Sequence, residues 1–152
     1  MERVDFYVLA GTDERERWRF ACRVIDKAFE AEQRVLVWLD DADAVTRFDE
    51  LLWTFAQDTF IPHEPLGAAS DWEEAPVLLT CPGATPVSPA PPASALPADV
   101  IVNLAASIPT ERQAVKQLIE IIDAEPSRRD TGRARFRQYR AEGVQPTTHN
   151  VG

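Results

Sequence analysis

The sequence predicts an α/β fold: a three-layer α/β/α sandwich around a mostly parallel central sheet. Two observations lead to this prediction. Short apolar runs alternate with segments of helical spacing from the first residues onward, which is typical of parallel strands joined by right-handed crossovers. The runs are also apolar along most of their length, as in strands covered on both faces. With 152 residues, 45% of them hydrophobic, the chain fits a single domain, 1–152, with one core.

The first part of the chain reads as a β-α-β unit. The runs 4–9 and 34–39 are rich in Val, Leu, Phe, Tyr and Trp and predict two strands. Between them, Asp13 followed by Glu16 predicts the start of a helix through a capping box. The apolar positions of this helix recur at helical spacing and are Trp18, Cys22, Ile25 and Phe29.

A second helix and two further strands follow. Helical spacing predicts a helix over about 42–55, with Val45, Phe48 and Leu52 on its apolar face. The runs 77–81 and 100–102 predict two more buried strands. Between these strands, residues 82–97 hold half of the 12 prolines among Ala, Ser, Thr and Gly. That composition predicts an extended surface insertion that the core does not need.

The last part of the chain predicts two helices and a tail. One helix is expected from Thr110 to Pro126, and its apolar face would consist of Val115, Leu118, Ile119 and Ile122. The other is expected from about Asp130 to Gly143, because glycine suits the position after a helix end. Residues 144–152 are expected to form a C-terminal tail too mobile to position His149 for catalysis.

The charge of the chain is unevenly distributed. The formal net charge is -9, yet residues 128–140 contain six arginines and one acid, a local charge of +5 that leaves -14 for the rest. An acidic body argues against tight direct binding of nucleic acid, which depends on positive charge. Direct binding of nucleic acid through the arginine segment stays open as a further hypothesis.

Other function classes receive little support from the sequence. The chain has no basic, apolar leader at its start and no run of about 18 apolar residues, so we expect a soluble, cytoplasmic protein with no membrane association. Cys22 and Cys81 are far apart and have no metal-ligand spacing around them. We expect both to be buried thiols, and we expect neither a metal nor a cofactor.

The alternative to a binding protein is a nucleotide- or magnesium-dependent α/β enzyme. The fold is Rossmann-like, but the loop after the first strand lacks the glycines of a dinucleotide fingerprint and the lysine of a P-loop. Asp40, Asp41 and Asp43 follow the second strand and could hold a magnesium ion or a ribose hydroxyl. The competing interpretation is that they cap the second helix. His63 has no spaced ligand partner and reads as a surface or packing histidine.

Several strings, in order and at matching spacing, resemble the DNA polymerase III chi family. They are Asp-Phe-Tyr at 5–7, Arg-Val-Leu at 34–36, Asp-Glu-Leu-Leu-Trp at 49–53, Phe-Ile-Pro-His at 60–63, Asp-Val-Ile-Val-Asn-Leu at 99–104, and Arg-Phe-Arg-Gln-Tyr-Arg at 135–140 with Gly143. The resemblance covers nearly the whole chain. Two departures are a longer, more proline-rich stretch at 82–97 and a shorter connection at 126–133.

The resemblance implies a non-catalytic adaptor of the clamp-loader complex. Chi proteins bridge the psi subunit to the single-stranded-DNA-binding protein, whose acidic C-terminal tail ends in Ile-Pro-Phe. Arg133, Phe136, Arg137 and Arg140 fall on one helix face, where arginines can bind carboxylates and Phe136 can contact the tail. Either Arg128 or Arg129 corresponds to the family's upstream basic residue. The alternative is a solvated helix that packs Phe136 and Tyr139 into the core.

A second contact implied by the resemblance involves Trp53 and Phe60. The family binds psi there or, in competition with psi, a helicase related to repair. Large aromatic residues are frequent interface anchors, and Pro62 and His63 are expected to shape the same surface. Two further expectations come from the residues themselves: Trp53 could instead close the second helix onto the sheet, and Leu52 should lie in the core.

Overall fold

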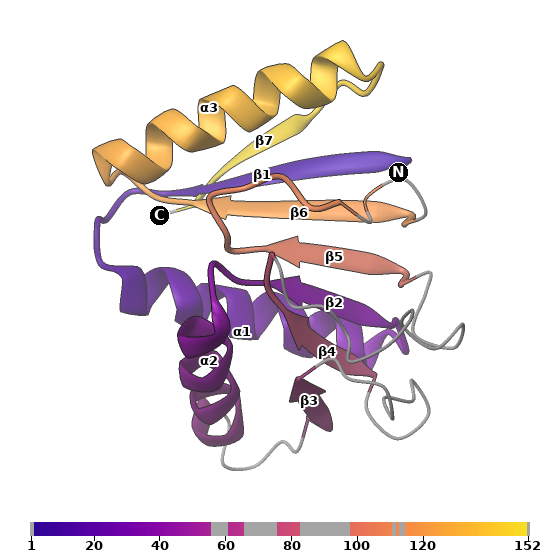
Figure 1. The fold of residues 1–152 in the computed structure, drawn as a ribbon. Coiled ribbons are helices and arrows are strands. Elements are labelled where there is room, and N and C mark those ends of the chain that lie inside the picture. Colours follow the sequence, from indigo (N-terminus) through magenta and orange to yellow (C-terminus); the bar gives the residue numbers. More distant parts are fainter. Residues whose placement is uncertain are drawn as a thin grey trace.

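In the computed structural model, residues 2–55, 61–65, 76–82, 98–110, 112 and 115–151 are described. These residues form one sheet of seven strands in the order β3-β4-β2-β5-β6-β1-β7 (Figure 1). The strands are β1 (Arg3–Leu9), β2 (Val35–Trp38), β3 (His63–Pro65), β4 (Val77–Thr80), β5 (Val100–Asn103), β6 (Gln117–Ile122) and β7 (Thr147–Val151). Every pairing in this sheet is parallel. The predicted α/β class is confirmed.

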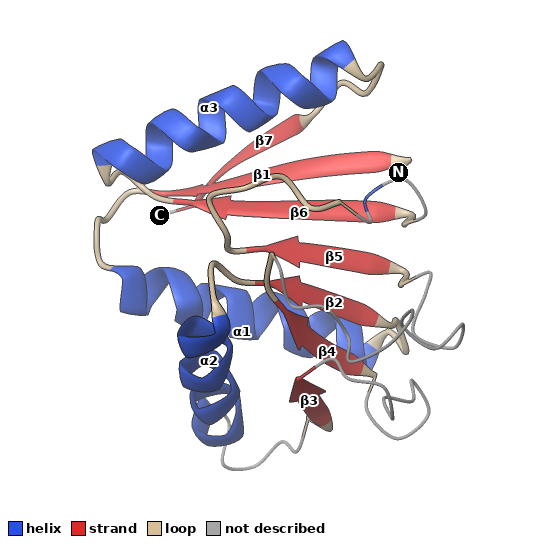
Figure 2. Cartoon of the chain, viewed as in Figure 1, coloured by secondary structure: helices blue, strands red, loops and turns tan. Residues whose placement is uncertain are grey.

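Helices cover both faces of the sheet, as Figure 2 shows. They are α1 (Glu14–Glu30), α2 (Ala42–Phe55) and α3 (Pro126–Ala141). Successive strand residues point to opposite faces, so Val35 and Val37 pack with α1 and α2, whereas Leu36 and Trp38 lie in the cluster that packs with α3. This double coverage explains why the central strands are apolar throughout.

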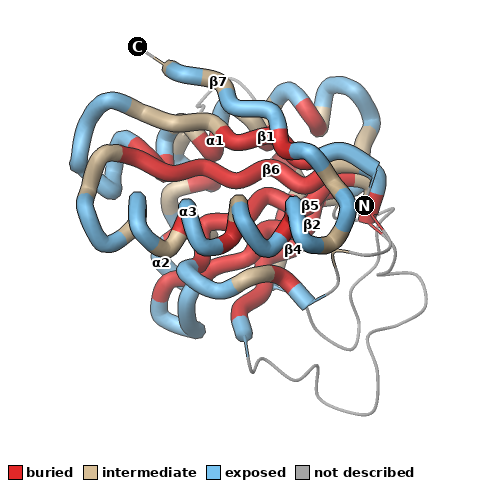
Figure 3. Tube along the Cα trace, turned by 90° about the horizontal axis from the view of Figure 1, so that it is seen from above, coloured by how far each residue is buried: buried red, intermediate tan, exposed pale blue. Residues whose placement is uncertain are grey.

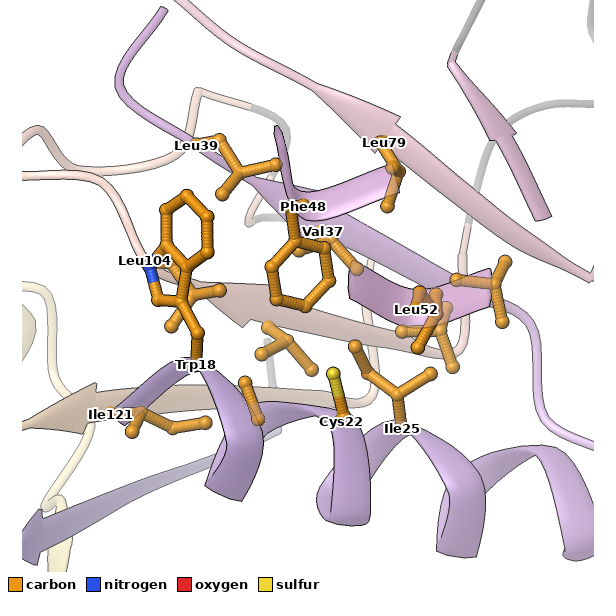
Figure 4. Packing of buried hydrophobic residues seen from close by; sticks show 14 of the residues in the cluster. Trp18, Cys22, Ile25, Val37, Leu39, Phe48, Leu52, Leu79, Leu104 and Ile121 are labelled. Carbon is orange, nitrogen blue, oxygen red and sulfur yellow. The ribbon is translucent and has the colours of Figure 1, made fainter. Parts of the chain in front are cut away.

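The predicted first two helices are confirmed, and both pack on the same face. Asp13 caps α1 by accepting a hydrogen bond from the Arg15 amide at 2.9 Å. Trp18 of α1 meets Phe48 of α2 edge-on, with ring centroids 5.4 Å apart. Figure 4 shows Trp18, Cys22 and Ile25 projecting from α1 into this cluster, together with Phe48 and Leu52. Cys22 and Cys81 are both buried free thiols, as predicted.

The helix predicted between Thr110 and Pro126 is wrong, because residues 117–122 form β6. This strand lies between β5 and β1 and is buried from Leu118 to Ile122. A strand covered on both faces is apolar at nearly every position, so it matches a helical pattern by coincidence. Its run of Ile residues at 119, 121 and 122 was the overlooked signal, since β-branched residues favour strands.

The final helix begins earlier than predicted. Pro126 is its first residue rather than the end of a preceding helix, and Glu125 is its N-cap. A Cβ atom on Gly132 would lie only 3.0 Å from Ile122, so this glycine lets α3 approach β6 closely. Gly143 follows the helix with a φ of 93°, a backbone conformation that glycine adopts without strain. The predicted helix end at Gly143 is therefore confirmed.

The predicted mobile tail is also wrong, because Thr147–Val151 forms β7 beside β1. Its sequence has no apolar alternation, and its side chains are exposed or half-buried, as expected of an edge strand. Figure 3 shows burial concentrated in the inner strands and lost toward β7. His149 lies within this strand, and its Nε2 atom lies 2.9 Å from Asp5 Oδ1.

Within the described residues, no helix has the length and apolarity needed to cross a membrane.

Candidate partner-binding surfaces

Helix α3 is held on the sheet by a buried polar cluster. Arg135 donates from Nε to both carboxylate oxygens of Glu120, at 3.0 Å each, and from Nη1 to the Ala106 carbonyl at 2.8 Å. Glu120 also accepts from the Tyr139 hydroxyl and from Asn103 Nδ2. Because Arg135 and Tyr139 point inward, the rotation of the helix is fixed, and four of its arginines, Arg129, Arg133, Arg137 and Arg140, are exposed.

The outward face of α3 carries arginines beside an aromatic ring. Arg129, Arg133, Arg137 and Arg140 are exposed. Phe136 is half-buried and packs on Phe6 of β1, with ring centroids 5.2 Å apart. The only ion pair of these four with a described residue is a loose contact of 4.0 Å from Arg133 to Asp130. This face can therefore offer guanidinium groups to an anionic ligand next to an apolar edge.

Arg128 and Arg129 have different environments. Arg128 donates from Nε and Nη2 to the buried carboxylate of Asp123, at 2.9 and 2.8 Å, and from Nη2 to the Thr12 carbonyl at 3.0 Å. Burial alone would raise the pKa of Asp123, but the hydrogen bonds from Arg128 and from the Glu125 amide, together with the charges of Arg128 and Arg17, hold that pKa below its ordinary value. Arg129 is exposed beside Asn150 and Val151 at the end of β7. Arg128 therefore holds α3 to the rest of the fold, whereas the guanidinium of Arg129 is accessible to a binding partner.

Trp53 and His63 form a second candidate surface at the opposite edge of the sheet. The Trp53 side chain is 47% exposed, and its ring lies 4.2 Å from that of His63. His63 is buried, with Nδ1 2.7 Å from the Ile61 carbonyl oxygen and Nε2 3.1 Å from that of Asp49. His63 is therefore a packing residue that supports Trp53 and ties β3 to α2. Pro62 is half-buried beside it.

The sequence predictions about Leu52, Phe60 and Trp53 at this edge have different outcomes. Leu52 is buried in the core, as predicted. Phe60 lies outside the described residues. Trp53 contacts β3 through His63 while 47% of it stays exposed, so the structure fits both the interpretation that it helps to hold α2 on the sheet and the prediction of an interface anchor.

The three aspartates after β2 do not converge on a common point. Asp41 accepts from the Ala44 amide at 2.8 Å and so caps α2, Asp40 accepts from the Ala106 amide at 2.8 Å, and Asp43 pairs with Arg47 on the surface. The capping interpretation is confirmed for Asp41. Nowhere in the described part of the chain do three or more His, Cys, Asp or Glu residues gather in a metal-binding arrangement.

The carboxyl ends of the central strands, where α/β proteins hold nucleotides, are occupied by a side chain of the protein. Arg17 of α1 is buried there and donates to the Leu104 and Ile121 carbonyls, at 2.8 Å each. Burial lowers the pKa of Arg17 to about 10. Among the described residues, the Arg17 guanidinium thus fills the place beyond these strand ends.

Comparison with known proteins decides the family. Residues 1–147 match the sequence model of a family described as DNA polymerase III chi subunit, HolC. The chain belongs to the DNA polymerase III chi subunit family. It is 31% identical to the DNA polymerase III subunit chi of Pseudomonas aeruginosa, over 99% of this chain and 98% of the relative. It is 23% identical to that of Haemophilus influenzae, over 97% and 96%, and 26% identical to that of Escherichia coli, over 86% and 82%.

The described residues that the chi family resemblance implies as binding sites lie in two separate places. The candidate tail-binding residues Arg129, Arg133, Phe136, Arg137 and Arg140 all lie on α3, where the four arginines are exposed and Phe136 is half-buried against Phe6 of β1. The candidate psi-binding residues Trp53, Pro62 and His63 lie at the β3 edge, far along the sheet from β7. Sequence reasoning missed Arg135 and Glu120, which orient the first group. A glutamate within an apolar strand was the available signal, since a buried carboxylate needs a partner.

Proposed function

We propose that this chi-family protein is a non-catalytic adaptor at the replication fork. The family makes it an accessory subunit of DNA polymerase III that acts in replication. The finer proposal is that it bridges the psi subunit of the clamp loader to the acidic C-terminal tail of single-stranded-DNA-binding protein in the cytoplasm. The observation that carries this proposal is the exposed arginine face of α3 beside the half-buried Phe136.

The chemistry of this face suits an acidic tail that ends in Ile-Pro-Phe. Arg133, Arg137 and Arg140 can bind the aspartates and the terminal carboxylate through forked hydrogen bonds. The exposed edge of Phe136 and the aliphatic parts of the arginines can contact the terminal phenylalanine of the tail. The acidic remainder of the molecule disfavours DNA as the ligand, because a long polyanion would be repelled beyond the arginine face.

We expect one such contact to be weak. Burial of a phenylalanine contributes roughly 2 to 3 kcal/mol, and each exposed ion pair contributes about 0.2 to 1 kcal/mol. After ordering costs, the total is near the roughly -8 kcal/mol of micromolar binding. Several tails on one DNA-coating oligomer would raise the effective concentration and restore useful strength.

The psi subunit is proposed to bind at the other edge, around Trp53. A half-exposed indole supported from below by a buried residue is a typical interface anchor, and His63 provides that support. A helicase related to repair would compete for the same surface. Because this edge and α3 are separate, both partners could bind at once.

The experiment that tests the tail contact is a titration with a peptide ending in Asp-Asp-Ile-Pro-Phe. The double variant Arg133→Glu, Arg137→Glu should lose measurable binding while its circular dichroism spectrum stays unchanged. The matched control is Arg15→Glu with Arg19→Glu, which alters the same amount of charge on exposed positions of α1. Undiminished peptide binding by the α3 variant would refute the site.

A further inference from the structure

A hollow lies on the opposite face of the sheet from α3, between α1 and the edge formed by β1 and β7. Its volume is about 440 Å³, within the range of roughly 300–1,000 Å³ typical of ligand pockets. The floor comes from the sheet and the wall from α1. We call it the α1 hollow, and the residues that matter here are Tyr7, Phe20, Arg23, Val24, Lys27 and Val151.

The apolar part of the α1 hollow is partly exposed and held in place. Tyr7 of β1 packs against Phe20 of α1, with ring centroids 5.5 Å apart. On its other side, Tyr7 stacks on His149 of β7 at 4.7 Å and an interplanar angle of 20°. Because Asp5 fixes His149 through a 2.9 Å hydrogen bond, the aromatic floor is preformed. A ligand would therefore lose little free energy in ordering it.

The charged side chains at the rim of the α1 hollow are both positive. Arg23 and Lys27 lie on one turn of the exposed side of α1, and the lining includes no carboxylate. Arg23 lies over the Phe20 ring at 5.8 Å, and neither cation forms an ion pair with another described residue. Two exposed cations without an ion pair to a described residue therefore border an apolar opening, which suits a ligand that carries carboxylates beside an apolar side chain.

We propose that the α1 hollow binds a short acidic peptide segment that inserts one bulky apolar side chain beside Tyr7 and Phe20. Arg23 and Lys27 would bind carboxylates flanking that side chain. A short segment fits better than nucleic acid, because only two cations border the opening and the rest of the body repels a long polyanion. This proposal goes beyond the adaptor function, since α3 packs on the other face of the sheet.

The probe for this site is the blocked peptide acetyl-Asp-Glu-Phe-Asp-Glu-amide, which lacks the terminal carboxylate required of the tail ligand. Amide chemical shifts of the full-length ¹⁵N-labelled protein would be followed during titration. We expect shifts at Tyr7, Phe20, Val24 and Val151. Replacing the probe's phenylalanine by alanine should weaken binding at least about tenfold, because that ring supplies most of the buried apolar area.

Variants of α1 separate a specific site from a general charge effect. Arg23→Glu with Lys27→Glu should weaken probe binding about tenfold, whereas the control Arg15→Glu with Arg19→Glu should change it less than about twofold. Arg133→Glu with Arg137→Glu should leave the α1 shifts in place even if that variant loses the tail peptide. The two proposals can therefore fail independently.

Four results would overturn the inference. The first is the absence of chemical-shift changes at millimolar probe, and the second is an equal loss of probe binding in the Arg23/Lys27 and Arg15/Arg19 variants. The third is chemical-shift changes that map to α3 and vanish in the Arg133/Arg137 variant. The fourth is larger chemical-shift changes of the same α1 residues with a single-stranded oligonucleotide. The last result would assign the α1 hollow to nucleic acid instead.

Discussion

The Nε atom of Arg135 lies 3.0 Å from both carboxylate oxygens of Glu120. The pair lies between α3 and β6, where both side chains are almost fully buried. Burial raises the pKa of Glu120, and the charge of Arg135 acts in the opposite direction. This contact sets the rotation of α3 and so decides which arginines can reach a partner.

Replacing Arg135 by methionine should destabilise the protein by about 3–5 kcal/mol, because Glu120 would remain as a buried charge without its partner. Urea unfolding measures this cost. Arg133→Met is the matched control, two positions along the same helix but exposed, and should change the free energy of unfolding by less than about 0.5 kcal/mol. Equal stability of the two variants would contradict the structural role of Arg135.

Arg128 should contribute to the stability of the fold, and Arg129 should contribute to binding of the tail peptide. Arg128→Ala removes two hydrogen bonds to the buried Asp123 and should cost about 1–3 kcal/mol of stability. Arg129→Ala should leave stability nearly unchanged and weaken the peptide ending in Ile-Pro-Phe by up to about fivefold. Fluorescence anisotropy of the labelled peptide, beside urea unfolding, checks both halves. The reverse pattern would show that Arg128 contacts the tail.

Asp5 should make stability sensitive to acid. Burial alone would raise its pKa, but hydrogen bonds from His149, Gln117 and Arg3 outweigh it and lower the pKa below the ordinary 3.8. A lowered folded-state pKa contributes stability that is complete above about pH 4 and is lost as the pH falls through the folded-state value. Asp5→Asn should therefore lower stability at pH 7 and flatten its decline below pH 4.

The control for Asp5 is Asp43→Asn, which changes an exposed carboxylate whose ion-pair partner among the described residues is Arg47. Urea unfolding at a series of pH values from 7 to 2 compares the two variants. The control should follow the parent protein, whose remaining acid sensitivity includes Asp123. A decline as steep in Asp5→Asn as in the parent would mean that Asp5 carries none of the effect.

Trp53→Ala should weaken a psi-type partner without unfolding the protein. The half-exposed indole rests on His63, so its loss should cost about 1–3 kcal/mol of stability, less than the loss of a fully buried tryptophan. The neighbouring Leu52→Ala removes a buried side chain and should cost about 2–5 kcal/mol. Calorimetric titration with psi and thermal unfolding make the comparison. If Trp53→Ala unfolds the protein, Trp53 is a core residue and the interface assignment fails.

The parts of the fold that were predictable are those where local signals agree. The helix over 42–55 has an Asp cap, helical spacing and a clear end, and its predicted bounds are confirmed. β6 was missed because a strand buried on both faces has no period of its own. β7 was missed because its residues form a strand through pairing with β1 and through the Asp5–His149 contact. No local sequence pattern encodes either interaction.

The candidate surfaces were predictable only in part, for a related reason. The exposed positions Arg133, Arg137 and Arg140 follow from helical spacing, and they are arranged on α3 as the spacing requires. The inward turn of Arg135 and the commitment of Arg128 to Asp123 depend on acids in β6 and just after it. Spacing within one helix cannot distinguish an arginine that binds a partner from one that binds its own sheet.

The place of β1 between β6 and β7 has a consequence for synthesis on the ribosome. Arg3 begins a strand whose neighbours are Gln117 and its successors on one side and Thr147 and its successors on the other. β1 is therefore translated long before either of the strands with which it pairs. We expect the nascent chain to keep an apolar segment in need of protection until β6 has also been translated.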